Sequence, residues 1–158
     1  MNEIQLEIRP AREHECGLVL DFIRKIAAYE LLSEHVFATK ELLYQALFVN
    51  HDCHVIIAFE ADKPVGFALY FYNFSTFKGK KGLYLEDLYV DDQYRKKGYG
   101  KQLIQYLIAH AAKTNCGRME WACLDWNQKA IDFYLALGAK PMDDWTIFRL
   151  DESDLVQH

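Results

Sequence analysis

Hydrophobic residues in the first third of the chain follow the spacing of a strand and then the spacing of helices. Apolar and polar residues alternate over residues 4–8, which predicts a strand that ends at Pro10, a residue without an amide donor. Apolar positions over residues 18–26 and 42–47 recur at helical spacing. They predict two amphipathic helices, the second of them capped by Thr39.

The middle of the chain carries three further strand patterns and one helix pattern. Residues 53–60 and 65–72 are rich in β-formers and flank a polar connection that ends in Pro64, so they predict a hairpin. Residues 83–90 form another apolar strand. This strand runs through a loop of glycines and basic residues into a helical pattern over residues 103–111.

The last third of the chain continues the mixture of strands and helices. Residues 119–124 predict a strand, and Asn127 is placed to cap a helix that Gly138 ends. The apolar run over residues 145–150 predicts a last strand. The chain shows no repeats, linkers or low-complexity tracts, which indicates one domain of the α/β (α+β) class over residues 1–158.

Composition and charge narrow the class of protein. Of the 158 residues, 51% are hydrophobic and 26% are charged, which suits one compact domain with a substantial core. The net charge of -5 argues against binding nucleic acid or an anionic membrane through a basic face, and favours a cationic substrate. The sequence shows neither a signal peptide nor an apolar run near the roughly 20 residues of a membrane span.

The cysteines indicate a reducing compartment. Cys16, Cys53, Cys116 and Cys123 have no CxxC spacing, and we interpret them as reduced thiols of a cytoplasmic protein. None lies in a motif that marks an activated nucleophile. Residues 51–54, His-Asp-Cys-His, are of metal-ligand types, but no second cluster is visible in the sequence, so no metal is expected.

Residues 95–100, Arg-Lys-Lys-Gly-Tyr-Gly, lie where a predicted strand gives way to a predicted helix. Glycines let successive backbone amides close around a phosphate at the positive end of the helix dipole, and the lysines add charge. The loop has neither the GK[ST] ending of a Walker loop nor the GxGxxG fingerprint. Taken alone, such a loop is more often an ordinary glycine turn with solvated basic residues.

In context, the apolar strand, the Arg-x-x-Gly-x-Gly loop and the apolar helix resemble the pyrophosphate-binding motif of the GNAT acyltransferase superfamily. Residues 125–127, Asp-Trp-Asn, and residues 133–139, Phe-Tyr-Leu-Ala-Leu-Gly-Ala, resemble the second half of its cofactor site. Residues 8–11, 29–30 and 83–87 narrow the resemblance to the diamine (spermidine/spermine) acetyltransferase branch, over nearly the whole chain.

Within that branch, the acceptor loops look more like the thialysine Nε-acetyltransferase subgroup. Residues 75–79 and 124–130 carry this likeness. Ser75 and Phe77 stand where the spermidine enzymes are expected to have an acid and a tryptophan. The resemblance therefore does not restrict the small-amine acceptor to the polyamines.

The resemblance implies a single-domain GNAT fold, a mixed and mostly antiparallel twisted sheet with helices on both faces. It also implies acetyl-CoA as cosubstrate and a homodimer. The residues that it implies for binding acetyl-CoA are Leu88, Tyr89, Val90, Arg95, Lys96, Lys97, Gly98, Tyr99, Gly100, Lys101, Asn127, Ala130 and Tyr134. The residues that it implies for binding the amine are Tyr29, Glu30, Phe77, Glu86, Glu120, Trp121, Ala122 and Asp144.

Acetyl transfer to an amine needs two proton transfers. An alkylammonium group, with a pKa of about 10.4, must lose a proton before it attacks, and the departing thiolate gains from receiving one. The resemblance assigns these roles to Glu86 and Tyr134, with an irregular strand near Leu88 freeing an amide for the oxyanion. From spacing alone, Tyr134 is more often a core aromatic and Glu86 a solvent-facing or lysine-paired acid. Asp87 is an equal candidate for the solvent-facing position.

The sequence thus predicts an N-acetyltransferase that moves acetyl from acetyl-CoA to a primary amine of a small molecule, by direct attack in a ternary complex. The acceptor is a thialysine or lysine analogue, a diamine or a polyamine. Two alternatives stay open: acetylation of a protein lysine or N-terminus, and a catalytically silent acyl-CoA-binding regulatory module. The silent module is disfavoured because Glu86 and Tyr134 are both present.

Overall fold

A computed structural model of the chain describes residues 5–157. These residues form two compact units, one that extends to Ala122 and one that begins at Cys123. Ile4, the first apolar position of the predicted N-terminal strand, lies outside the described residues.

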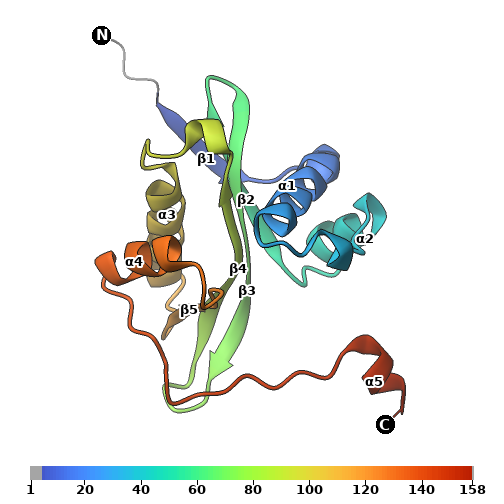
Figure 1. The fold of residues 1–158 in the computed structure, drawn as a ribbon, viewed down its shortest axis with the longest axis vertical. Coiled ribbons are helices and arrows are strands. Elements are labelled where there is room, and N and C mark those ends of the chain that lie inside the picture. Colours follow the sequence, from blue (N-terminus) through green and yellow to red (C-terminus); the bar gives the residue numbers. More distant parts are fainter. Residues whose placement is uncertain (1–4, 158) are drawn as a thin grey trace. The chain divides into compact units, whose positions relative to one another are not determined.

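The first unit contains a five-stranded sheet among the described residues, with the strand order β1-β2-β3-β4-β5 (Figure 1). The first four strands pair antiparallel in succession, and the fifth runs parallel to the fourth. Their bounds are Leu6–Pro10 (β1), His54–Glu60 (β2), Lys63–Ser75 (β3), Lys80–Val90 (β4) and Met119–Trp121 (β5). The predicted mixed and mostly antiparallel sheet is confirmed, although β5 is shorter than the strand predicted over residues 119–124.

The predicted hairpin is formed by β2 and β3, which pair antiparallel. Its turn is tighter than expected, because Glu60 already pairs with Lys63 and only Ala61 and Asp62 connect the strands, with φ of 48° and 65°. Two left-handed residues are the geometry of a two-residue hairpin turn. Pro64 lies within β3 rather than in the connection, at a shift of the β2–β3 register, where a missing amide donor is tolerated.

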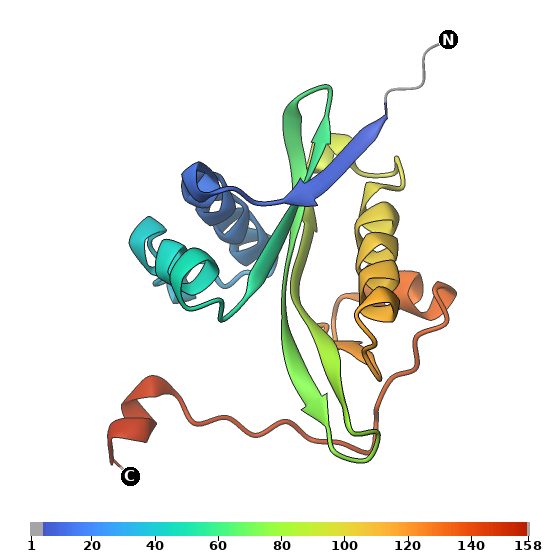
Figure 2. The same cartoon turned by 180° about the vertical axis from the view of Figure 1, so that it is seen from behind.

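Helices cover both faces of the sheet (Figures 1 and 2). α1 (Cys16–Tyr29), α2 (Lys40–Tyr44) and the π-helical segment η3 (Gln45–Val49) lie on one face, and α3 (Tyr99–Lys113) lies on the other. Thr39 caps α2 as predicted, since its Oγ1 accepts a hydrogen bond from the Leu42 amide at 3.2 Å. Short 3₁₀ turns are η1 (Glu13–Glu15), η2 (Ser33–His35) and η4 (Asp92–Tyr94).

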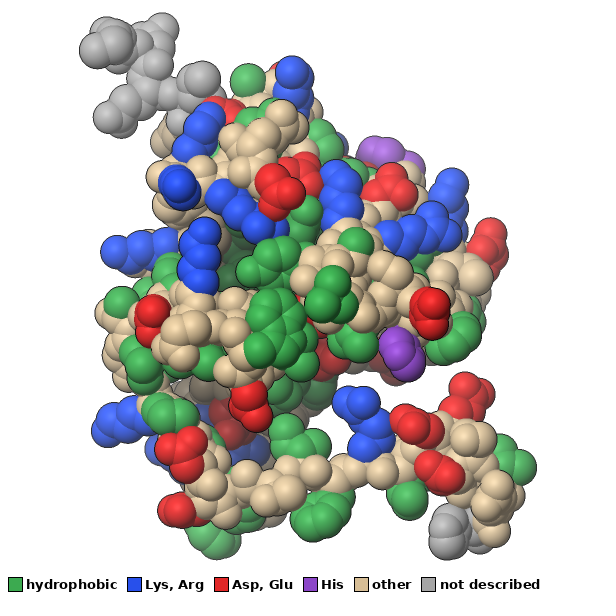
Figure 3. Space-filling model, in the orientation of Figure 1, with side chains coloured by type: hydrophobic (Ala, Val, Ile, Leu, Met, Phe, Trp, Pro, Cys, Tyr) green, Lys and Arg blue, Asp and Glu red, His purple; other side chains and the backbone are tan. Residues whose placement is uncertain are grey.

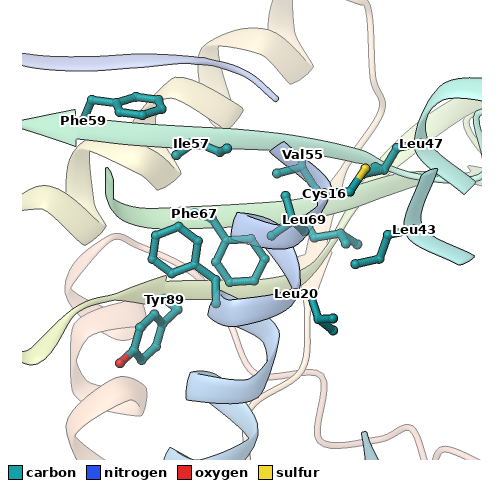
Figure 4. Packing of buried hydrophobic residues seen from close by; sticks show 12 residues of the cluster. Cys16, Leu20, Leu43, Leu47, Val55, Ile57, Phe59, Phe67, Leu69 and Tyr89 are labelled. Atoms are coloured by element: carbon teal, nitrogen blue, oxygen red, sulfur yellow. The ribbon is translucent and has the colours of Figure 1, made fainter. Parts of the chain in front are cut away.

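The core between α1, α2 and the sheet explains why these patterns fold as they do (Figure 4). Alternate residues of β2, Val55, Ile57 and Phe59, face this cluster because successive strand residues point to opposite faces. The rings of Phe22 in α1 and Phe67 in β3 stack at 5.2 Å. Each fully buried side chain of this size contributes about 1.5–3 kcal/mol, so the amphipathic pattern fixes both elements.

The second unit contains α4 (Gln128–Ala136) and α5 (Glu152–Gln157). Asn127 caps α4 as predicted, because its side-chain oxygen accepts a hydrogen bond from the Ala130 amide at 3.3 Å. Gly138 follows the helix with a φ of 91°, a conformation that favours glycine. Both predicted ends of this helix are confirmed.

The predicted strand over residues 145–150 is wrong. These residues pair with no strand in the part of the chain that the structure describes. A strand needs a partner for its backbone groups, and β-forming side chains do not supply one. Trp145, Ile147 and Phe148 are 75%, 77% and 91% exposed, and Figure 3 shows hydrophobic side chains along this extended segment.

Candidate active site

β4 departs from regular pairing at one residue. Asp87 is paired with Leu69 and Leu85 is paired with Tyr70, so Glu86 is an extra residue on β4. An extra residue forms a β-bulge, which bends the strand and re-aims neighbouring side chains. The bulge leaves Glu86 exposed and Asp87 half-buried. The predicted irregularity is present, slightly earlier in the strand than expected.

Three carboxylates interact electrostatically around this bulge. Burial, and then the negative charges of Glu86 and Glu30, raise the pKa of Asp87 to about 7. Burial and the charge of Glu86 also raise the pKa of Glu30, which follows the last residue of α1. A carboxyl group with a pKa near neutrality exchanges a proton readily at physiological pH. Three neighbouring acids also favour a cationic ligand.

The loop between β4 and α3 has a backbone suited to an anion. Lys96 and Gly98 are left-handed, with φ of 66° and 78°. The first hydrogen bond of α3 joins the Gln102 amide to the Gly98 carbonyl at 3.0 Å, so the amides of the preceding residues point out of the helix end. Such amides lie at the positive end of the helix dipole, where phosphates bind.

Arg95 fastens this loop to two other elements. Its Nε donates to the Val90 carbonyl at 3.0 Å, and its guanidinium forms an ion pair with Asp92 at 2.9 Å. The guanidinium also lies 4.9 Å from the ring centre of Tyr29 and 5.4 Å from that of Tyr89. The structure therefore brings predicted cofactor residues of β4 and the loop together with the predicted substrate residue at the end of α1.

The lysines of the loop differ in their surroundings. Lys97 Nζ lies 3.3 Å from Glu60 Oε1. Lys96 and Lys101 are exposed, and neither forms an ion pair with another residue between 5 and 157. Lys and Arg side chains gather over this end of the first unit in Figure 3. Lys96 and Lys101 are thus the loop lysines best able to meet an anion from solution.

The predicted acceptor residues are only partly brought together. Trp121 in β5 pairs with Leu85, directly before the bulge, and Glu120 is held by Arg118 at 2.7 Å. Ala122 follows β5 at the end of the first unit. Phe77, by contrast, lies fully exposed in the turn at the far end of the β3–β4 hairpin, so this chain does not bring it to the bulge.

The remaining predicted residues belong to the second unit. Ala130 and Tyr134 are four residues apart in α4 and therefore lie on one face of the helix. Tyr134 is half-buried, and its ring lies 5.5 Å from that of Phe133. Asn127 is at the start of α4, and Asp144 lies in a turn that follows the helix.

Cysteine chemistry is unremarkable in the described part of the chain, where the four cysteines are free thiols. Burial raises the pKa of Cys16 and of Cys53, which makes both poor nucleophiles at neutral pH.

Among residues 5–157, no group of three or more His, Cys, Asp and Glu is arranged to hold a metal ion. Within the same residues, no helix has the length and apolar character of a membrane span.

Two charged residues near the site, Asp87 and Glu60, have no role assigned from the sequence. Glu86 and Asp87 were equal candidates for the solvent-facing position, and the structure gives it to Glu86. Two adjacent acids in an apolar strand conflict with regular alternation, and this was the available signal of a bulge. Glu60 lies at the end of a strand pattern, where the sequence gives no sign that it is buried.

Comparisons with known proteins identify the family of this chain. A family model described as the acetyltransferase (GNAT) family matches residues 20–139. The thialysine N-epsilon-acetyltransferase of Bos taurus is 36% identical over 156 residues, which cover 91% of each chain. The spermidine/spermine N(1)-acetyltransferase-like protein 1 of Homo sapiens is 32% identical over 161 residues, which cover 95% of this chain and 23% of that protein.

A solved structure is similar over almost the whole length. It is an integron cassette protein from the mobile metagenome of V. cholerae, with a TM-score of 0.81 and 28% sequence identity. The match covers 98% of both chains. The mixed sheet with helices on both faces is therefore an arrangement that this chain shares with an experimentally determined structure.

Proposed function

This chain belongs to the acetyltransferase (GNAT) family and is an acyl-CoA-dependent N-acetyltransferase, and from this premise we propose that it transfers acetyl from acetyl-CoA to a primary amine of a small molecule. The observation that carries the proposal is the set of three interacting carboxylates, Glu30, Glu86 and Asp87, at the bulge of β4. Together they attract an ammonium group and offer an acceptor for its proton.

The start of α3 fits the pyrophosphate of acetyl-CoA. Left-handed residues in the loop and outward-pointing amides at the helix end form the kind of cradle that an anion needs. Exposed Lys96 and Lys101 would add positive charge. The backbone of Leu88 and Val90 would bind the pantetheine. From the resemblance, Asn127 and Ala130 are also proposed as cofactor residues. On this proposal, residues 1–158 act as one GNAT domain.

The Glu86 and Asp87 pair would deprotonate the substrate. Glu86 is exposed and would meet the ammonium first, and Asp87 has the pKa suited to holding a proton near pH 7. The negative charge of Glu86 contributes to the raised pKa of Asp87, so the two acids would act together. This extends the role expected for Glu86 alone.

Acetyl-CoA supplies a thioester, and the transfer itself would be direct. The neutral amine attacks the carbonyl carbon, the carbon–sulfur bond breaks, and Tyr134 gives its phenolic proton to the departing sulfur. The proton that the ammonium lost before the attack stays with the carboxylate pair, and the second proton, which the nitrogen loses as the amide forms, restores the Tyr134 phenol. The raised pKa values of Cys16 and Cys53 argue against an acetyl-cysteine intermediate at those positions.

The acceptor we propose is a thialysine or lysine analogue, or a diamine or polyamine, as the names of the relatives indicate. Tyr29, Glu30, Glu120 and Trp121 would surround it near the bulge. We further propose a cytoplasmic homodimer in which the second copy contributes its exposed Phe77 and Asp144.

The first experiment measures CoA release from acetyl-CoA with a panel of thialysine, lysine, ornithine, putrescine, spermidine and basic peptides. We expect rapid turnover with one or more of the small amines and little with the peptides. Turnover confined to the peptides would support a protein or peptide acetyltransferase instead. CoA binding without turnover on any acceptor would support a silent binding module.

A further inference from the structure

A buried carboxylate lies beside the proposed pyrophosphate loop, where its charge should be unfavourable. Glu60, the last residue of β2, is only 7% exposed. A buried negative charge is costly unless it is partnered, and next to a bound pyrophosphate it adds repulsion. The proposed function gives Glu60 no task, so its position needs a compensating role.

The ion pair of the Glu60 side chain is made with the loop. Its Oε1 is 3.3 Å from Lys97 Nζ. Burial, and then the interaction of its hydroxyl with Glu60, raise the pKa of Tyr99. The Lys97 ammonium also lies over the rings of Tyr94, at 5.4 Å, and Tyr99, at 5.9 Å. The ammonium of the exposed Lys97 side chain thus lies near one acid and two aromatic rings of the protein.

The backbone conformation of the loop needs other contacts to hold it. Lys96 and Gly98, on either side of Lys97, are both left-handed. For a residue with a Cβ such as Lys96, that backbone conformation is unfavourable and persists only where surrounding contacts hold it. Glu60 is well placed to hold it, because it is fixed at the base of the tight β2–β3 turn by its pairing with Lys63.

We propose that Glu60 is a positioning residue that fastens Lys97 and Tyr99, so that the amides at the start of α3 keep the shape that accepts the pyrophosphate. Lys97 then acts as an anchor of the loop and is not itself a phosphate ligand. This inference rests on the proposed function, in which the loop holds acetyl-CoA. It predicts that removing a negative charge weakens the binding of an anion.

The test compares Glu60→Gln, Glu60→Asp, Lys97→Met and the Glu60→Gln/Lys97→Met double variant. Calorimetry gives the Kd for CoA, steady-state kinetics give kcat and the KM for acetyl-CoA, and Tm reports folding. Asp62→Asn is the matched control, because it removes an exposed acid two residues away that lies outside the loop. CoA binding to the unchanged protein is measured first.

We expect Glu60→Gln and Lys97→Met each to raise the Kd for CoA and the KM for acetyl-CoA by roughly tenfold, with kcat nearly unchanged. The double variant should bind no more weakly than either single variant, because both break the same contact. Glu60→Asp should recover part of the affinity, and Asp62→Asn should bind as well as the unchanged protein or slightly better.

Two results would overturn the proposal. Tighter binding in Glu60→Gln would mean that Glu60 only repels the cofactor, and unchanged binding would mean that it does not shape the loop. Additive losses of affinity in the double variant would mean that Lys97 binds phosphate independently. If Glu60→Gln does not fold, the exposed Lys97→Met still decides, because unchanged CoA affinity there excludes the anchor. Failure of the unchanged protein to bind CoA would instead reject the proposed function and this inference with it.

Discussion

Asp87 shows how a single backbone irregularity changes the chemistry of a residue. An exposed aspartate has a pKa of about 3.9 and is a weak base for an ammonium proton. The bulge at Glu86 places Asp87 in a half-buried position beside two other acids, and its pKa rises to about 7. A base is most effective when its pKa lies near the working pH.

We therefore predict that Asp87→Asn removes the rise of kcat/KM through about pH 7. Below that pH Asp87 holds a proton and cannot accept another, so the rate should increase as the pH rises through 7. The loss at pH 8 should be roughly 100-fold. The measurement is kcat/KM for the best amine between pH 5.5 and 9.

Glu86→Gln is the matched comparison for Asp87. It should keep an inflection in the pH profile, at a lower pH because one neighbouring charge is gone, and raise the KM for the amine. The opposite pattern, with the inflection lost in Glu86→Gln and kept in Asp87→Asn, would assign the base to Glu86 as the sequence indicated.

Tyr134 offers a second test at the scale of one atom. Tyr134→Phe removes the proposed proton donor to the departing sulfur, so kcat should fall by roughly 100-fold while the Kd for CoA changes little. Tyr106→Phe, on an exposed part of α3, serves as the control. An unchanged kcat in Tyr134→Phe would contradict the assigned role.

The residues that could be predicted from the sequence are those whose chemistry depends on backbone type. Gly98 and Gly138 mark left-handed positions, and Thr39 and Asn127 mark caps, because few residue types suit such places. Which of Glu86 and Asp87 faces inward stayed open, and the burial of Glu60 was not predicted. Both depend on register and on contacts between strands and loops far apart in sequence.

At the scale of elements, the start of α3 concentrates the demands of the proposed cofactor site. We predict that Gly98→Ala destabilises the chain by about 1 kcal/mol, because a Cβ is unfavourable at a φ of 78°. The expected fall in Tm is roughly 2–4 °C. Affinity for CoA should also fall, since the amides beside Gly98 would move.

Gly79→Ala separates strain from binding. Gly79 has a similar φ of 64°, and it lies in the β3–β4 turn, outside the proposed cofactor site. It should lose similar stability, as measured by thermal unfolding, and keep its affinity for CoA, as measured by calorimetry. Equal losses of affinity in both variants would argue against a special role for the loop.

Element prediction succeeded where an apolar pattern had a partner to pack against. The pattern over residues 18–26 became α1 because its apolar face covers the sheet. The equally apolar pattern over residues 145–150 remained unpaired among the described residues. Periodicity shows what an element is able to bury, but pairing is settled by the rest of the fold.

At the scale of the whole molecule, the proposed chemistry should reduce stability. The folded chain holds a proton on Asp87 up to about pH 7, whereas the unfolded chain releases it near pH 4. The contribution of this group to the free energy of unfolding is therefore full below about pH 4 and is lost as the pH rises through 7. A neutral side chain at this position would avoid that loss.

We predict that the Tm of Asp87→Asn, relative to the unchanged protein, is more favourable at pH 8 than at pH 4.5. The Tm of the variant is compared with that of the unchanged protein at each pH, because two histidines also change the stability of both proteins. The pKa values of His54 and His110 are lowered by burial, so these residues reduce stability as the pH falls below about 6.5. Asp62→Asn should show a Tm difference independent of pH. A Tm difference for Asp87→Asn that is also independent of pH would contradict a raised pKa of Asp87.

The bulge of β4 also constrains how the length of this sequence can change during evolution. The residues on both sides of Glu86 are already paired with β3, so deletion of the single codon for Glu86 would leave an uninterrupted ladder. Such a deletion would preserve the fold and remove the irregularity on which the environment of Asp87 depends. Purifying selection against in-frame deletion at this codon would therefore act through catalysis rather than through folding.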